Sequence, residues 1–232
     1  MTANEPSVSL YMHPLSSYCW KALIALHESG LPFHIEMVEG QPAQHEKLRQ
    51  LWPIGKMPVL HDARRDKAVP EASIIVEYLQ QHYPGPAHLI PHDPDLQLEV
   101  RLWDRFFDLY VHTSLQKLVN DRLRAPGEQD STGAADARAM LTTAYDLLEE
   151  RMDSRDWVAA HSFTLADCAA LPALFYCAAA RPFAGSHPYV TRYFERLLTR
   201  VSVQRVIDGA RPYFHLFPMC GALDTRFTRA AA

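Results

Sequence analysis

The sequence has little of what marks several large classes of protein. Its 232 residues include four cysteines, Cys19, Cys168, Cys177 and Cys220, and no two of them are spaced as metal ligands usually are. No apolar run approaches the length of a membrane span, and the N-terminus lacks the basic and apolar regions of a secretory signal. We therefore expect a cytoplasmic protein that needs neither a metal nor a membrane.

Positive charge is also scarce. The chain has 23 Lys and Arg against 27 Asp and Glu, a formal net charge of -4 at pH 7. Residues 1–90 hold 7 of the basic and 9 of the acidic residues, so no part of the chain forms a basic stripe. Because neutralising phosphates requires clustered Lys and Arg, nucleic acid is not an expected partner. A glycine-rich phosphate loop, a Gly-x-Ser-x-Gly elbow and a metalloprotease helix motif are likewise missing.

The first third of the chain alternates short strands with short helices. Apolar periodicity and turn residues predict the order β-α-β-α-β-β-α. The elements are a strand at 8–12, a helix at 20–29, a strand at 33–37, a helix at 44–51, strands at 58–61 and 68–69, and a helix at 73–83. The first strand–helix–strand unit implies a parallel pair with a right-handed crossover, and the last two strands form a hairpin.

The composition changes after this region. Pro84-Gly85-Pro86, Pro91 and Pro94 mark a linker, which gives domains at 1–84 and 95–232 with the linker at 85–94. Only helices are predicted beyond it, at 96–123, 134–152, 165–180, 188–199 and 202–210. The segment 165–180 is apolar nearly all round and is expected to be buried, with Pro172 kinking it or removing one backbone bond.

A candidate chemical site lies where the first strand meets the first helix, at Ser16-Ser17-Tyr18-Cys19. A helix N-terminus carries unsatisfied N–H groups and positive partial charge, which lower the pKa of a thiol placed there. A serine hydroxyl can donate a further hydrogen bond to the sulfur, and a cofactor can supply that sulfur. Ser16 or Ser17 can also be a helix cap and nothing more. Tyr11, at the end of the strand, is a second hydroxyl candidate.

Two further segments can hold a peptide-like ligand. Met57-Pro58 opens a strand, and a cis bond there would turn the backbone groups of Met57 outward, while a trans proline would be an ordinary strand edge. Glu71-Ala72-Ser73 lies between a strand and a helix, where backbone N–H groups bind carboxylates and the Glu71 side chain can bind an amino group. The alternative is a solvated Glu in a first helical turn.

A third motif is structural. Phe163-Thr164-Leu165-Ala166-Asp167 has the pattern of a capping box, with Asp in place of the usual Glu or Gln. It is expected to fix the start of the buried helix at 165–180. No chemical role is assigned to it.

These segments, in this order, resemble the cytosolic glutathione transferases over nearly the whole chain. The matching stretches are Leu10-Tyr11 through Ser16-Ser17-Tyr18-Cys19-Trp20-Lys21, then Pro53 to Leu60, Glu71 to Leu79, and Phe163 to Asp167. The resemblance implies a thioredoxin-like α/β domain followed by an all-helical bundle. It also implies a serine-type active site like that of the theta and zeta enzymes. The zeta register selects Ser16, which we prefer, and the shorter theta register selects Ser17.

The same resemblance implies roles for the other segments. Met57 would bind the cysteinyl backbone of glutathione, with Pro58 in the cis form. Glu71 and Ala72 would hold the γ-glutamyl group. Lys56, or less favourably His45, would face the glycine carboxylate.

The chain departs from its relatives at two places. Most of them have Ser where this chain has Ala72, so a hydroxyl contact is lost unless Ser73 supplies it. They also usually carry a glycine in the loop that here reads Ala159-Ala160-His161-Ser162. The first departure weakens glutathione binding, and the second alters the shape of a loop.

The function that follows from the resemblance is a glutathione S-transferase acting in detoxification. Glutathione thiolate would attack small, mostly apolar electrophiles, with Tyr110, Phe107, Phe175, Phe214 and Phe217 as candidates for lining their pocket. A homodimer is expected. The alternatives are a binding or regulatory module of the same fold without turnover, and another glutathione-dependent enzyme such as an isomerase or a dehalogenase.

Overall fold

The computed structural model describes residues 6–228, and the chain divides into two compact units between Ile90 and Pro91. The first unit has the predicted order of strands and helices. Its elements are β1 (Val8–Met12), α1 (Ser17–Ser29), β2 (Phe33–Met37), α2 (Pro42–Leu51), β3 (Val59–Asp62), β4 (Lys67–Pro70) and α3 (Ala72–His82). The thioredoxin-like α/β architecture expected from the sequence is confirmed.

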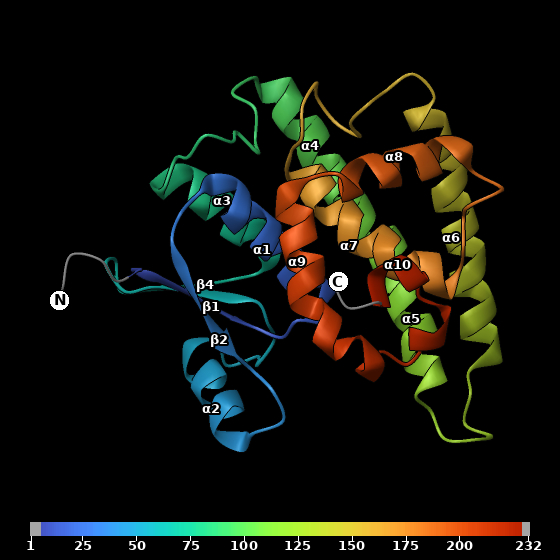
Figure 1. The fold of residues 1–232 in the computed structure, drawn as a ribbon, viewed down its shortest axis with the longest axis horizontal. Coiled ribbons are helices and arrows are strands. Elements are labelled where there is room, and N and C mark those ends of the chain that lie inside the picture. The colour runs from blue at the N-terminus through green and yellow to red at the C-terminus, as the bar shows by residue number, and fades with distance from the viewer. Residues whose placement is uncertain (1–5, 229–232) are drawn as a thin grey trace. The chain divides into compact units, whose positions relative to one another are not determined.

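The four strands form one mixed sheet in the order β2-β1-β3-β4. β1 runs parallel to β2, with Val8 opposite Phe33, while β3 is antiparallel to both β1 and β4. The parallel pair and the hairpin are therefore as predicted. Helices α1 and α3 pack together on one side of the sheet, and α2 lies on the other (Figure 1). This sandwich brings the start of α1 and the start of α3 to the same side of the sheet.

Helix α1 begins three residues before the predicted start at Trp20. Ser16 is its N-cap, in an extended conformation, and the Ser16 Oγ accepts a hydrogen bond from the backbone N of Cys19 at 3.4 Å. The helix ends as expected at Gly30, whose φ of 69° is easy only for glycine. The capping serine therefore sets the position of the first helical turn.

Within the described residues the second unit is entirely helical, which confirms the predicted bundle. Its elements are α4 (Pro94–Phe106), the π-helix η1 (Phe107–His112), α5 (Thr113–Arg122), α6 (Ser131–Met152), α7 (Leu165–Ala180), α8 (Pro188–Leu198) and α9 (Val201–Ala210), followed by the 3-10 helices η2 (Arg211–Leu216) and η3 (Cys220–Ala222) and by α10 (Thr225–Thr228).

The single helix predicted at 96–123 contains a π-helical segment, η1, between α4 and α5. A π-turn closes with i→i+5 hydrogen bonds, so it holds more residues per turn than an α-helix. The buried face consequently moves by one position. Tyr110, expected on that face, is 48% exposed, and Val111 is buried in its place.

Helix α7 is the core of the second unit, with every residue from Leu165 to Cys177 buried. The capping box at its start is confirmed, because Asp167 accepts a hydrogen bond from the backbone N of Thr164 at 2.8 Å. Pro172 lies inside the helix, which continues to Ala180.

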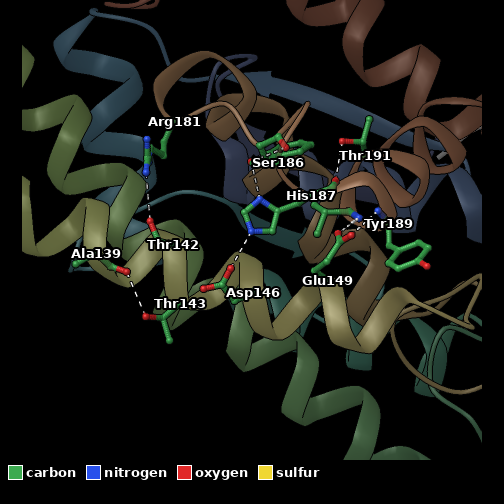
Figure 2. Close-up of polar contacts among 12 residues, drawn as sticks. Ala139, Thr142, Thr143, Asp146, Glu149, Arg181, Ser186, His187, Tyr189 and Thr191 are labelled. Carbon is green, nitrogen blue, oxygen red and sulfur yellow. Dashed lines mark hydrogen bonds and ion pairs between the residues drawn. The ribbon is translucent and has the colours of Figure 1, made fainter.

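Helix α8 is capped from α6 (Figure 2). The Glu149 carboxylate accepts hydrogen bonds from the backbone N–H groups of Tyr189 and Val190, at 2.9 and 2.8 Å. Beside it, His187 lies between Ser186 and Asp146, with Nδ1 2.8 Å from Ser186 Oγ and Nε2 3.0 Å from Asp146 Oδ1. This row has the composition of a hydrolase triad. The backbone N–H groups at this helix start are occupied by Glu149, and the row joins α6 to the start of α8.

Candidate functional site

The turn between β1 and α1 is held by a compact set of hydrogen bonds. The backbone N of Ser16 donates to the carbonyl of His13 at 2.9 Å, and the indole N–H of Trp20 donates to the carbonyl of Pro14 at 2.5 Å. The Nδ1 of His13 accepts from the backbone N of Leu15 at 3.2 Å. Burial lowers the pKa of His13, against an opposing effect of Glu39, so its imidazole is neutral at pH 7.

Ser16 combines the two roles that the sequence left open. Its Oγ accepts from the backbone N of Cys19, which is a cap contact. A serine hydroxyl has two acceptor lone pairs and one O–H donor, so the cap contact leaves the O–H able to donate. Ser16 is half-buried at the first turn of α1, and Ser17, also half-buried, is the first residue of the helix.

Tyr11 faces a different part of the first unit. Its ring packs in a cluster with Val38, Leu48 and Val59, where Leu48 belongs to α2. The Nζ of Lys47, on α2, lies 5.4 Å from the centroid of that ring. The tyrosine is therefore on the α2 side of the sheet, and α1 is on the other side.

Cys19 does not supply a reactive sulfur. It is fully buried, and burial raises the pKa of its thiol to about 12 despite the opposing hydrogen bonds of Ser16 and His13. The group therefore stays a neutral thiol at pH 7. Cys19 is therefore not a source of thiolate at this helix start.

The bond between Met57 and Pro58 is cis, as the resemblance implied. The half-buried Met57 side chain packs on the cluster that contains Tyr11, and Pro58 is buried. The preceding residue, Lys56, is exposed, and His45 on α2 is half-buried.

Glu71 has a strained backbone at the start of α3. Its φ is 69° and its ψ is 121°, a region that a residue with a side chain occupies at a cost of about 1–3 kcal/mol. Its exposed carboxylate makes no cap contact with its own helix. The first N–H groups of α3, on Ala72 and Ser73, follow this residue in the chain and form the N-terminal end of the helix. Such strain is typical of ligand sites.

Lys21 lies in one of the stretches that resemble the family, but no role for it is predicted from the sequence. Its side chain is 1% exposed, and its Nζ donates to the Oγ of Ser73 at 2.8 Å, which joins α1 to the first turn of α3. The hydroxyl of Ser73, the proposed substitute for the missing serine at Ala72, is thus bonded to Lys21. The available signal was a lysine in an otherwise apolar helical stretch, Trp20 to Ile24.

Most of the aromatic residues proposed to line an electrophile pocket are core residues. Phe107, Phe175, Phe214 and Phe217 are buried, and only Tyr110 is exposed. Phe175 stacks on Phe214, with ring centroids 5.6 Å apart. Core packing accounts for these four rings.

Comparison with known proteins identifies the family. A model of the glutathione S-transferase N-terminal domain matches residues 10–87, and a model of the C-terminal domain matches residues 105–200. The chain belongs to the glutathione S-transferase family. Among its curated relatives is the glutathione S-transferase-like protein LUC7 of a Fusarium species, 31% identical over 74% of this chain and 78% of the relative. Glutathione S-transferase F6 of Arabidopsis thaliana is 25% identical over 86% of this chain and 99% of its own length.

Solved structures of glutathione S-transferases share the fold. One from Methylobacillus flagellatus, with glutathione bound, has a TM-score of 0.76 and 26% identity, and covers 86% of this chain and 98% of its own. The segments of Ser16, Met57 and Glu71 all lie within the part matched by the glutathione S-transferase N-terminal model. Among the described residues no group of three or more His, Cys, Asp or Glu is arranged to hold a metal ion. No helix in the described part is both long and apolar enough to cross a membrane.

Proposed function

We propose that this protein ionises the thiol of bound glutathione and directs it at small apolar electrophiles. The observation that carries the proposal is the position of Ser16, whose Oγ caps α1 by accepting from the backbone N of Cys19 and whose O–H is not used by that contact. A sulfur at this helix start would receive that hydrogen bond together with the positive partial charge of the helix N-terminus. Both effects favour the thiolate, which is the nucleophile.

The rest of the tripeptide is proposed to bind along the same unit. The backbone of Met57, which precedes the cis Pro58, would pair with the cysteinyl residue as an added strand does. The α3 start would hold the γ-glutamyl group, its carboxylate on the N–H groups of Ala72 and Ser73 and its amine on Glu71. The exposed Lys56 would face the glycine carboxylate.

Substitution of Ser16 tests the proposal directly. A hydrogen bond to a charged group contributes about 1.5–3 kcal/mol, so Ser16→Ala is expected to lower kcat for 1-chloro-2,4-dinitrobenzene about thirtyfold while the Kd of glutathione changes less than threefold. Ser16→Thr keeps both the cap and the hydroxyl and is expected to retain most activity. Ser17→Ala is the matched control.

The pH–rate profile separates the chemical role of Ser16 from its cap role. Loss of the donor is expected to raise the apparent pKa of the bound thiol, whereas loss of a cap alone costs about 1 kcal/mol of stability and leaves that pKa unchanged. Equal activity of Ser16→Ala and the parent would transfer the role to Ser17.

A second candidate function is a glutathione-binding module of the same fold without turnover. Ala72 favours it, because the hydroxyl contact that most relatives make at this position is missing. Retention on immobilised glutathione without turnover of a varied electrophile panel would support this alternative. Activity restricted to a cis-enone diacid would instead indicate an isomerase.

The proposed enzyme is a cytoplasmic homodimer that acts in detoxification. All four cysteines are free thiols, which suits a reducing compartment. Leu98 and Leu102 lie four residues apart on α4, so they share one helix face, and they are 66% and 65% exposed. Leu109, on η1, is also exposed. Exposed apolar faces of this kind are typical of subunit interfaces. In the proposed homodimer a second copy of the chain would cover the face that carries Leu98 and Leu102.

A further inference from the structure

The helical unit contains a cleft with charged and polar walls. It has a volume of about 620 Å³ and lies between the C-terminal ends of α5 and α7, the first half of α6 and the segment 218–222. Its lining runs from Leu118 to Ala222 in the chain, so every lining residue belongs to the second unit. The volume is within the range of about 300–1,000 Å³ that is usual for small-molecule sites.

Two arginines line this cleft from different helices. Arg122 is on α5 and Arg138 is on α6, and both are exposed. Among residues 6–228, neither guanidinium makes a hydrogen bond or an ion pair, whereas most arginines of the second unit have such a partner. A guanidinium without a partner keeps five N–H donors in a fork that matches the oxygens of phosphate and carboxylate. Both unpaired forks are therefore available to an anion in the same cleft.

The acidic residue in the lining, Asp121, already has partners of its own. Its Oδ1 accepts a hydrogen bond from the backbone N of Asp130 at 2.6 Å, and the Nε of Arg124 lies 3.9 Å from the same oxygen. The charge of Asp121 is thus offset outside the cleft. With Arg122 and Arg138 on its walls, the cleft has a net positive charge, which favours an anionic ligand.

A further guanidinium lies next to the cleft. Arg181 follows directly after the lining residue Ala180, and it donates to the Oγ1 of Thr142 at 3.3 Å (Figure 2). Thr142 is four residues from Arg138 on α6, so the two lie on the same face of that helix. Arg181 therefore adds to the positive potential on the α6 side of the cleft.

The remaining walls suit an uncharged body that carries hydroxyl groups and a ring. Ala179 and Ala180 are the last residues of α7, and the last carbonyls of a helix accept hydrogen bonds from outside it. Leu118 is buried and Met219 is half-buried, so they form an apolar wall, and a methionine sulfur packs well against a flat ring. Anion, hydroxyl groups and ring together describe a nucleotide.

We propose that this cleft binds a nucleoside monophosphate. Arg122 and Arg138 would hold the phosphate, the carbonyls at the end of α7 would accept from the ribose hydroxyls, and the base would pack on Met219. A phosphate is favoured over a carboxylate because its three free oxygens can accept from two arginine forks at once. The inference uses no group of the proposed glutathione site and does not rest on the transferase activity.

Calorimetric titration of the full chain with adenosine 5′-monophosphate tests the site. We expect one molecule to bind per chain with a Kd below about 1 mM, and saturating glutathione to leave that Kd unchanged. Adenosine lacks the phosphate and inorganic phosphate lacks the body, so each is expected to bind at least tenfold more weakly. Competition by glutathione, or inorganic phosphate binding as tightly as the nucleotide, would overturn the proposal.

Arginine substitutions locate the binding. Arg122→Gln and Arg138→Gln are each expected to weaken nucleotide binding at least tenfold, because each removes charge-assisted hydrogen bonds. Arg205→Gln is the matched control and is expected to change binding less than twofold, since Arg205 is also exposed and unpaired among the described residues but is not part of the cleft lining. Equal weakening in all three variants would show a general effect of charge and would overturn the proposal.

A measurement on the parent keeps the proposal falsifiable without any variant. Tungstate is a tetrahedral oxyanion like phosphate and gives a strong anomalous signal. Crystals soaked with it are expected to show the tungsten peak between Arg122 and Arg138, and prior soaking with adenosine 5′-monophosphate is expected to remove that peak. A tungsten peak only elsewhere, or one that the nucleotide does not displace, would overturn the proposal.

Discussion

Asp167 allows a quantitative test of how the helical unit is held together. It lies fully buried at the first turn of α7 and accepts four hydrogen bonds. Its Oδ1 accepts from Tyr193 Oη at 2.6 Å and from the backbone N of Val158 at 3.4 Å. Its Oδ2 accepts from the backbone N and the Oγ1 of Thr164, at 2.8 and 3.1 Å.

Burial and hydrogen bonding act on this carboxyl in opposite directions. Burial is the larger effect, and it raises the pKa of Asp167 from 3.8 to about 6, although the bonds from Tyr193, Thr164 and Val158 oppose it. The folded state therefore binds the proton more tightly than the unfolded state does. The stability that protonated Asp167 contributes to the folded state is fully present below pH 3.8 and is lost as the pH rises through about 6.

The magnitude follows from linkage. At 1.36 kcal/mol per pKa unit, the full effect is about 3 kcal/mol, of which about 2 kcal/mol is lost between pH 4.5 and pH 8. The comparison is with Asp167→Asn, which has nearly the same shape and does not titrate. Other carboxyl groups titrate equally in both proteins, so their contributions cancel in the difference. The free energy of unfolding is measured by urea denaturation across this pH range.

We expect the free energy of unfolding of the parent, measured relative to that of Asp167→Asn, to fall by about 2 kcal/mol as the pH rises from 4.5 to 8. A difference that stays constant within about 0.5 kcal/mol would refute the reasoning. Such a result would mean that the four hydrogen bonds outweigh burial and that Asp167 is ionised throughout. The capping box would then hold a buried charge.

Three other substitutions follow from the structure. Lys21→Met removes a buried charge beside the α3 start and is expected to raise the Kd of glutathione about fivefold in calorimetric titration; an unchanged Kd would confine Lys21 to a structural role. The double substitution Leu98→Glu and Leu102→Glu is expected to give a monomer in sedimentation at micromolar concentration, and a persisting dimer would place the interface elsewhere. Glu99→Ala is expected to lower the free energy of unfolding by about 2 kcal/mol in urea denaturation, because Glu99 accepts from the backbone N of Ala160 at 2.7 Å; a loss below 0.5 kcal/mol would contradict this.

The order of elements in the first unit was predictable because each carries its own local signal. The strands alternate or end in turn residues, and Gly30 marks the end of α1. The start of α1 was placed three residues late because Ser17 and Cys19 are weak helix formers, and the cap at Ser16 compensates for them. The Ser16 cap thus outweighs the low helix propensity of Ser17 and Cys19 and sets the start of α1.

Features that depend on contacts distant in the sequence were not predictable. The π-turn at η1 moves the buried face from Tyr110 to Val111, and no periodicity of an α-helix reports such an insertion. The loop Ala159-Ala160-His161-Ser162, where relatives usually carry a glycine, was expected to differ in shape, and Ala160 is the residue that shows it. Its φ of 53° shows that it adopts the left-handed conformation that glycine favours, at a cost of about 1–2 kcal/mol. Glu99, 61 residues earlier, holds it there.

Of the two departures from the family pattern, Ala72 is the one that bears on the proposed glutathione site. Ala72 removes one neutral hydroxyl contact, which is worth about 1 kcal/mol or about fivefold in glutathione affinity. The start of α3, the positive φ of Glu71 and the buried Lys21 remain, so the proposed carboxylate site would keep its backbone donors. None of these groups is proposed to contact the sulfur. A loss of turnover would therefore have to come from the α1 end, where Ser16 retains its hydroxyl, and weak glutathione affinity alone would not distinguish a binding module from a transferase.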